Sequence, residues 1–105
     1  MAGRNVVWTR TADMQFVGIL EYWVHRNKSN TYSKKLVSFV SKTTKQIAKN
    51  PNLFKATNYK DIRVASLNQY SIFYKVYSDQ IVILAFWDNR QDDKKLLQYL
   101  KTRNK

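Results

Sequence analysis

The sequence predicts a single α+β domain over residues 1–105, with the element order strand, helix, helix, strand, strand, strand, helix (β-α-α-β-β-β-α). Three observations lead to this fold class. First, 105 residues with a 44% hydrophobic composition suit one small domain with one compact core. Second, apolar residues recur at helical spacing in two segments of the N-terminal half. Third, the apolar period changes to two in the C-terminal half, which is typical of strands.

A short run of β-branched and aromatic residues at positions 4–9 predicts the first strand. From Ala12 to Trp23 the apolar residues follow one helix face, which predicts an amphipathic helix. Either Thr9 or Thr11 can cap its N-terminus, because a hydroxyl oxygen there accepts a bond from an otherwise unpaired backbone N–H.

A second helix is expected after the basic residues 25–28, where cations favour a helix end. It ends at Asn50–Pro51, because proline cannot continue the backbone hydrogen bonding. The short link between the two helices predicts an antiparallel hairpin. The apolar residues that share one face of this helix are Tyr32, Leu36, Phe39, Val40 and Ile47.

The C-terminal half predicts three strands after an irregular stretch at residues 52–58. Residues 59–67 and 70–77 alternate as half-buried strands do. Residues 81–87 are apolar on both faces, so we expect an interior strand covered on both sides. A polar turn at residues 88–93 then leads into a short final helix. The leucines that mark this helix are Leu96, Leu97 and Leu100.

The composition excludes several classes of site. The chain has no cysteine, which excludes disulfides, thiol nucleophiles and Cys-ligated zinc. His25 is the single histidine, so a histidine metal cluster is excluded, and we expect no metal and no cofactor. Asp88, Asp92 and Asp93 crowd one turn, where helix capping is the expected role rather than cation binding. The longest apolar run is far shorter than the ~20 residues of a membrane span, so no membrane partner is expected.

Positive charge is the dominant chemical signal. Nineteen Lys and Arg against seven Asp and Glu leave a net charge of +12, which attracts acidic or polyanionic partners. The polar face of the second predicted helix is either a solvated surface or a partner-binding surface. Arg90 either pairs with a neighbouring carboxylate or contacts a partner. The side chains expected to bind partners are Arg63, Lys75, Arg90, Lys34, Lys35 and Lys42.

Several segments, taken in order, resemble one family of bacterial proteins. These segments are Val7-Trp8-Thr9, Tyr22-Trp23, Arg26-Asn27, Ser29, Asn50-Pro51, Ile62-Arg63 and residues 70–76, 81–84 and 87–92. Over residues 5–100 the chain resembles the RelE/ParE superfamily of toxins from type II toxin–antitoxin systems, and looks most like its ParE-like, plasmid-stabilisation branch.

The resemblance implies a helical hairpin packed on a small, mainly antiparallel sheet with a short C-terminal helix. It also implies growth inhibition in the bacterial cytoplasm and neutralisation by a cognate acidic antitoxin, with which the toxin can form a hetero-oligomer. The net charge of +12 agrees independently with an acidic partner.

Two activities occur in the superfamily that the chain resembles. ParE-like members bind DNA gyrase and trap it on cleaved DNA, whereas RelE-like members cut messenger RNA on the ribosome with positively charged side chains. Lys60, Arg63 and Arg90 match basic positions of the nucleases, but Ser71 stands where these usually carry an arginine.

The first hypothesis is therefore a toxin without enzymatic activity that binds gyrase. The alternative is an mRNA endoribonuclease that uses Lys60, Arg63 and Arg90, with Lys75 as a further candidate. A third hypothesis is a basic nucleic-acid-binding domain with no toxin role.

Overall fold

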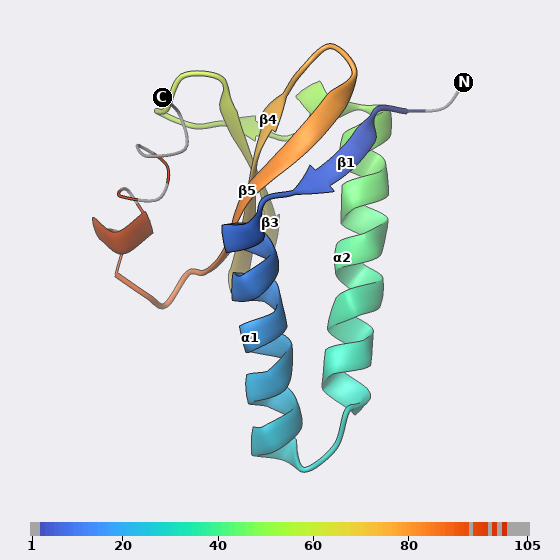
Figure 1. Cartoon of the computed structure of the whole chain (residues 1–105), viewed down its shortest axis with the longest axis vertical. Coiled ribbons are helices and arrows are strands. Elements are labelled where there is room, and N and C mark those ends of the chain that lie inside the picture. The colour runs from blue at the N-terminus through green and yellow to red at the C-terminus, as the bar shows by residue number, and fades with distance from the viewer. Residues whose placement is uncertain (1–2, 93, 97, 99, 101–105) are drawn as a thin grey trace.

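The computed structural model describes residues 3–92, 94–96, 98 and 100 and confirms the α+β class (Figure 1). Residues 94–96, 98 and 100 are helical, in agreement with the predicted final helix, whereas Leu97 lies outside the described residues. The other elements are β1 (Asn5–Trp8), α1 (Arg10–Asn27), α2 (Thr31–Lys49), the 3₁₀ helix η1 (Pro51–Leu53), β2 (Lys55–Ala56), β3 (Ile62–Leu67), β4 (Tyr70–Val76) and β5 (Gln80–Asp88).

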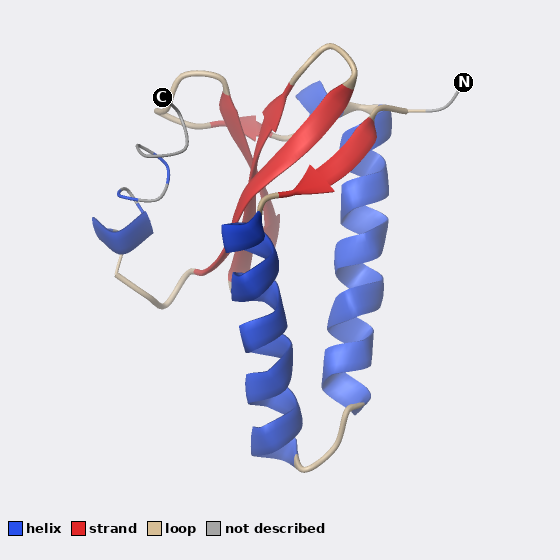
Figure 2. Ribbon diagram, viewed as in Figure 1, coloured by secondary structure: helices blue, strands red, loops and turns tan. Residues whose placement is uncertain are grey.

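The five strands form one sheet in the order β1-β5-β4-β3-β2. Three of the four strand pairs are antiparallel, and only the β1–β5 pair is parallel, so the expected mainly antiparallel sheet is confirmed. The α1–α2 hairpin follows β1 in the chain, before η1 and β2, and lies beside the sheet (Figure 2). Among the described residues, neither helix has the length and apolar content that a bilayer crossing requires.

One short strand differs from the sequence prediction. Residues 52–58 were expected to be irregular, but Lys55 and Ala56 form β2 by pairing with Val64 and Arg63 of β3. A segment of two residues is too short to show a periodic apolar pattern. The strand forms because the outer edge of β3 offers backbone hydrogen-bond partners.

The sheet has a core on each face. On the hairpin side, buried residues of α2 such as Ile47 pack with Ile72 of β4 and Ile83 of β5. On the opposite side, Leu96 and Leu100 of the final helix pack in a smaller core. The strand β5 is therefore interior and covered on both faces, as its continuous apolar run predicted.

A β-bulge in β5 distributes its apolar residues between the two cores. Phe73 of β4 lies opposite Ala85, and the next residue, Tyr74, lies opposite Ile83, so Leu84 is an extra residue on β5. Leu84 and Ala85 consequently both join the core under the final helix. The sequence conceals this bulge, because every residue around it is apolar.

The first helix begins two residues before the start that its apolar pattern predicted. Its N-cap is Thr9, as expected, and the Oγ1 of this residue accepts a hydrogen bond of 3.1 Å from the backbone N–H of Ala12. The N–H of Thr9 also donates to the carbonyl of Ile83, so the cap joins the start of α1 to β5.

Candidate functional site

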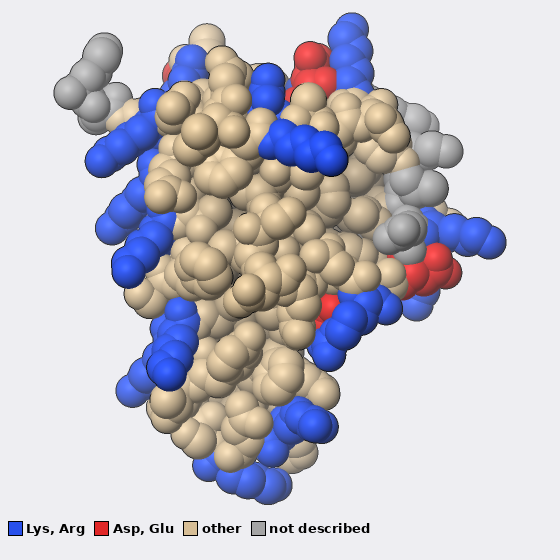
Figure 3. All heavy atoms as spheres, turned by 180° about the vertical axis from the view of Figure 1, so that it is seen from behind, with Lys and Arg blue, Asp and Glu red and all other residues tan. Residues whose placement is uncertain are grey.

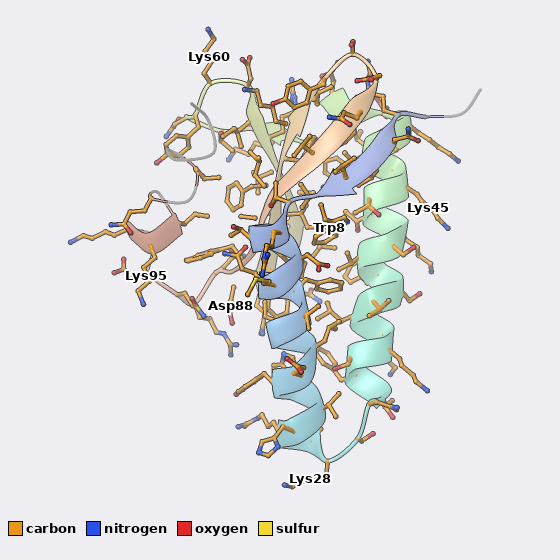
Figure 4. All side chains as sticks on the ribbon, in the orientation of Figure 1. Trp8, Lys28, Lys45, Lys60, Asp88 and Lys95 are labelled. Atoms are coloured by element: carbon orange, nitrogen blue, oxygen red, sulfur yellow. The ribbon has the colours of Figure 1, made fainter. Side chains whose placement is uncertain are left out.

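Three of the predicted basic residues lie around one groove at the end of the sheet. This edge groove has a volume of about 650 Å³ and is lined by Asn52 and by residues 56–63 and 75–77. The three cations are Lys60, Arg63 and Lys75. Lys60 is exposed and points away from the molecule at the turn before β3 (Figure 4).

Arg63 is half-buried and bonded to the backbone. Its Nη1 donates a 2.7 Å hydrogen bond to the carbonyl oxygen of Phe54, which lies just before β2. Thr57 holds the same loop, because its hydroxyl donates a 2.7 Å bond to the carbonyl of Ile62. The guanidinium of Arg63 therefore helps to build the wall of the edge groove.

Arg63 and Lys75 approach the edge groove from opposite faces of the sheet. Arg63 pairs with Tyr74 across β3 and β4, whereas the neighbouring Lys75 pairs with Ile62. Since successive side chains of a strand point to opposite faces, the two cations flank the sheet. The ammonium of Lys75 lies 5.7 Å from the centre of the Tyr77 ring, within range of a cation–π contact.

Tyr74 ties the helical layer to this end of the sheet. Its side chain is fully buried, and its hydroxyl donates a 2.7 Å hydrogen bond to the carbonyl of Pro51. Burial raises the pKa of Tyr74 to about 12, because the phenolate would lose its hydration. Tyr70 is also buried, so both residues pack in the core.

A second groove lies beside α1 at the other end of β4. This α1 groove has a volume of about 660 Å³ and is lined by α1 from Met14 to Tyr22, by the end of β5 and by Arg90. Met14 and Tyr22 are 62% and 51% exposed, so the groove offers apolar surface next to a cation. A side chain at Gly18 would meet no atom within 4 Å, which shows that this wall is open.

Arg90 forms an ion pair with Asp88 at the rim of the α1 groove. Its Nη2 and Nε donate hydrogen bonds of 2.7 Å and 3.0 Å to the two carboxylate oxygens. The Arg90 side chain is nevertheless 58% exposed, against 12% for Asp88. The bond from Arg90 lowers the pKa of Asp88. Two roles were predicted for Arg90. The ion pair with a neighbouring carboxylate is present, and the guanidinium is exposed enough to contact a partner as well.

Asp92 is the other acidic residue of this turn that the structure describes. The carboxylate of Asp92 accepts a 2.9 Å hydrogen bond from the backbone N–H of Lys94, the capping role expected from the sequence. Asp93 lies outside the described residues. Within the part of the chain that the structure describes, no group of three His, Cys, Asp or Glu side chains could hold a metal ion.

The three candidate nuclease residues do not converge on one site. Lys60 and Arg63 line the edge groove, whereas Arg90 lines the α1 groove. Tyr70 pairs with Asp88 near Arg90, and Lys75 pairs with Val82 near the edge groove. The five strand steps between Tyr70 and Lys75 correspond to roughly 17 Å.

Ser71 is held inside the protein rather than presented to a ligand. It is 6% exposed, and its hydroxyl donates a 2.8 Å hydrogen bond to the side-chain oxygen of Asn89. Neither groove is lined by this residue. Ser71 therefore has a structural role here.

The predicted partner-binding lysines of α2 lie on a third surface. Lys34, Lys35 and Lys42 are exposed and line neither groove. Figure 3 shows Lys and Arg side chains in a row along one long edge of the molecule, on the side of α2.

The apolar half of the α1 groove was missed by sequence reasoning, although Met14 and Tyr22 lie off the buried face of their helix and could have indicated it.

The fold and the basic surfaces agree with the RelE/ParE superfamily of toxins that the sequence resembles. A family model described as "ParE toxin of type II toxin-antitoxin system, parDE" matches residues 6–93. The chain therefore belongs to the ParE toxin family of type II toxin–antitoxin systems, which confirms the resemblance found in the sequence. No curated protein is a significant match to the chain.

Two solved structures share the fold. The chromosomal ParDE toxin–antitoxin system from P. aeruginosa matches with a TM-score of 0.68 and 20% identity, over 79% of this chain and 92% of that one. The toxin–antitoxin complex RelBE2 from Mycobacterium tuberculosis matches with a TM-score of 0.62 and 16% identity, over 87% of this chain and 97% of that one. At these identities the likeness establishes the fold.

Proposed function

We propose that this toxin arrests growth by binding DNA gyrase and does not cut RNA. The observation that carries the proposal is the separation of the basic residues. Cleavage of RNA needs cations that together stabilise the charge developing on one phosphate, within hydrogen-bond distance of its oxygens. Arg90 follows Asp88, which pairs with Tyr70, whereas Lys75 of the edge groove lies five strand steps, or roughly 17 Å, further along β4 from Tyr70.

Two further features support a toxin without nuclease activity. The guanidinium of Arg63 is bonded to the carbonyl of Phe54, and the guanidinium of Arg90 is bonded to Asp88. The hydroxyl of Ser71 is neutral and bonded to Asn89, so it cannot replace a guanidinium on a phosphate.

The edge groove favours mRNA cleavage as the second candidate function. It brings Lys60, Arg63 and Lys75 around a single concave surface. A nuclease built on this groove would use Lys75 in place of Arg90 to neutralise the phosphate.

A cognate acidic antitoxin is part of the same proposal. Both solved relatives come from toxin–antitoxin systems, and a net charge of +12 favours an acidic partner. In the α1 groove, exposed Met14 and Tyr22 lie beside Arg90 and Lys95. A segment with apolar and acidic residues would complement this surface, and together with the toxin it would form a hetero-oligomer. Action in the bacterial cytoplasm and plasmid stabilisation follow from the same proposal.

The decisive experiment measures both activities with one preparation. Purified toxin should inhibit supercoiling by gyrase and stabilise cleaved DNA, and the addition of antitoxin should reverse this effect. The same toxin should leave messenger RNA intact in a translating extract. Codon-positioned cuts that disappear in both Lys60→Ala and Lys75→Ala would overturn the proposal in favour of the nuclease.

A further inference from the structure

The exposed face of α2 carries five lysines in a stripe that neither groove includes. The residues of this lysine stripe are Lys34, Lys35, Lys42, Lys45 and Lys49, and all are exposed. At 3.6 residues per turn, their positions fall within an arc of about 100° on the helix, over a length of about 22 Å. The labelled Lys45 points away from the molecule in Figure 4.

The stripe has no internal counter-charge. The helix α2 contains no acidic residue, and the sequence has none between Glu21 and Asp61. None of the five lysines forms an ion pair within the described part of the chain. The buried residues of α2, among them Leu36, Val40 and Ile47, lie on the opposite side of the helix. The positive charge therefore faces solvent as one band along the helix.

We infer that the lysine stripe binds the phosphate backbone of duplex DNA without sequence specificity. Its length of about 22 Å spans roughly six or seven base pairs at 3.4 Å per phosphate on one strand. Lysine ammonium groups act as point charges on phosphates, and counterion release supplies the binding free energy. The inference does not depend on whether gyrase or the ribosome is the target of the toxin.

The chemistry of the stripe favours DNA over an acidic peptide. A disordered acidic segment must bury apolar side chains to offset the entropy lost when it becomes ordered. No apolar residue lies within the arc of the five lysines, where Ser38 is a polar residue between them. A duplex is already ordered and requires only a row of charges. Val37 and Phe39 lie on either side of this arc and are 44% and 45% exposed. The apolar surface that a peptide needs is more exposed in the α1 groove, where Met14 and Tyr22 are 62% and 51% exposed.

The test measures binding of the full chain to a fluorescent 20-base-pair duplex of random sequence, from 50 to 300 mM NaCl. In the stripe variant, all five stripe lysines are replaced by glutamine. A matched control removes the same charge from five exposed cations elsewhere. The control replaces Arg10, Arg26, Lys28, Lys55 and Lys94 with glutamine.

The stripe variant should bind the duplex at least tenfold more weakly at 50 mM NaCl. Its plot of log affinity against log salt concentration should be less steep by about 4.5, since each of five phosphate contacts contributes about 0.9. The control should keep the slope of the unchanged protein. A third variant with arginine at the five stripe positions should retain binding, which separates charge from any effect on folding.

Two results would overturn the inference. If the stripe variant and the control lose affinity equally, net charge alone is responsible. If the stripe variant keeps its affinity for the duplex but loses affinity for a polyglutamate peptide, the surface serves an acidic protein.

Discussion

Two arginines near opposite ends of the β3–β4–β5 sheet show how one residue type can have different roles. Arg63 is half-buried in the edge groove, and its guanidinium donates a hydrogen bond to the backbone carbonyl of Phe54, nine residues away in sequence. Arg90 is 58% exposed at the α1 groove and bonds only to the side chain of Asp88 among the described residues. Both were predicted to match basic positions of the superfamily, yet Arg63 stabilises a loop whereas Arg90 remains accessible to a partner. The following predictions test this contrast.

The largest expected effect is on stability, in Arg63→Ala. This substitution removes a charged hydrogen bond and leaves the carbonyl of Phe54 without that donor. The free energy of unfolding should fall by about 2 kcal/mol, which corresponds to roughly 8 °C or more in melting temperature. Lys60→Ala is the control, because Lys60 is exposed in the same groove and its loss should change stability by less than about 0.5 kcal/mol. Equal melting temperatures in the two variants would contradict the structural role of Arg63.

Arg90→Ala should show the opposite behaviour. Because the ion pair lies on the surface, the melting temperature of the free toxin should be nearly unchanged. Affinity for the antitoxin, or toxicity on induced expression, should fall at least tenfold if Arg90 contacts an acidic partner. Calorimetric titration of the purified antitoxin measures the first quantity. A variant that loses several degrees of melting temperature but keeps full toxicity would show that Arg90 has a structural role, like Arg63.

Tyr74→Phe tests how the helical layer is attached at the Arg63 end. Loss of the hydroxyl leaves the carbonyl of Pro51 without its partner, at a cost of about 1 kcal/mol near neutral pH.

The pH dependence of Tyr74 gives an independent check. The pKa of Tyr74 is raised to about 12, so the folded protein keeps this proton while the unfolded chain loses it near pH 10. The stabilisation is therefore present below pH 10 and is lost as the pH rises toward 12. Urea unfolding at pH 8 to 11.5 should show the gap between the two proteins closing. Parallel curves would mean that Tyr74 does not titrate in this way.

The smallest effect is expected for Asp88→Asn at the Arg90 end. Arg90 lowers the pKa of Asp88, so the pair stabilises the fold above the usual carboxylate pKa, and this stabilisation disappears as the pH falls through the lowered value. The variant should be slightly less stable than the unchanged toxin at pH 7 and equal to it in strong acid. Its affinity for an acidic antitoxin should be equal or higher, because Arg90 is released. A lower affinity would mean that Asp88, rather than Arg90, contacts the antitoxin.

Much of the fold could be predicted because it depends on local patterns. The apolar spacing from Ala12 to Trp23 and the proline at position 51 located both helices, and the run at residues 81–87 identified the interior strand. The strand β2 was missed, since two residues have no period. The candidate site was predicted less completely, because Lys60, Arg63 and Arg90 were grouped by residue type and the structure separates them.

The sequence by itself determined the order of the helices and of the longer strands, the basic character and the lysine stripe of α2. These properties follow from composition and from residue spacing within one element, which fixes the face on which each side chain lies. Only the tertiary structure decided the parallel pairing of β1 with β5, the bulge at Leu84 and the distance between the cations. Each of these depends on strand register between segments far apart in the chain. Register is selected by the packing of the whole core, and no local pattern records it.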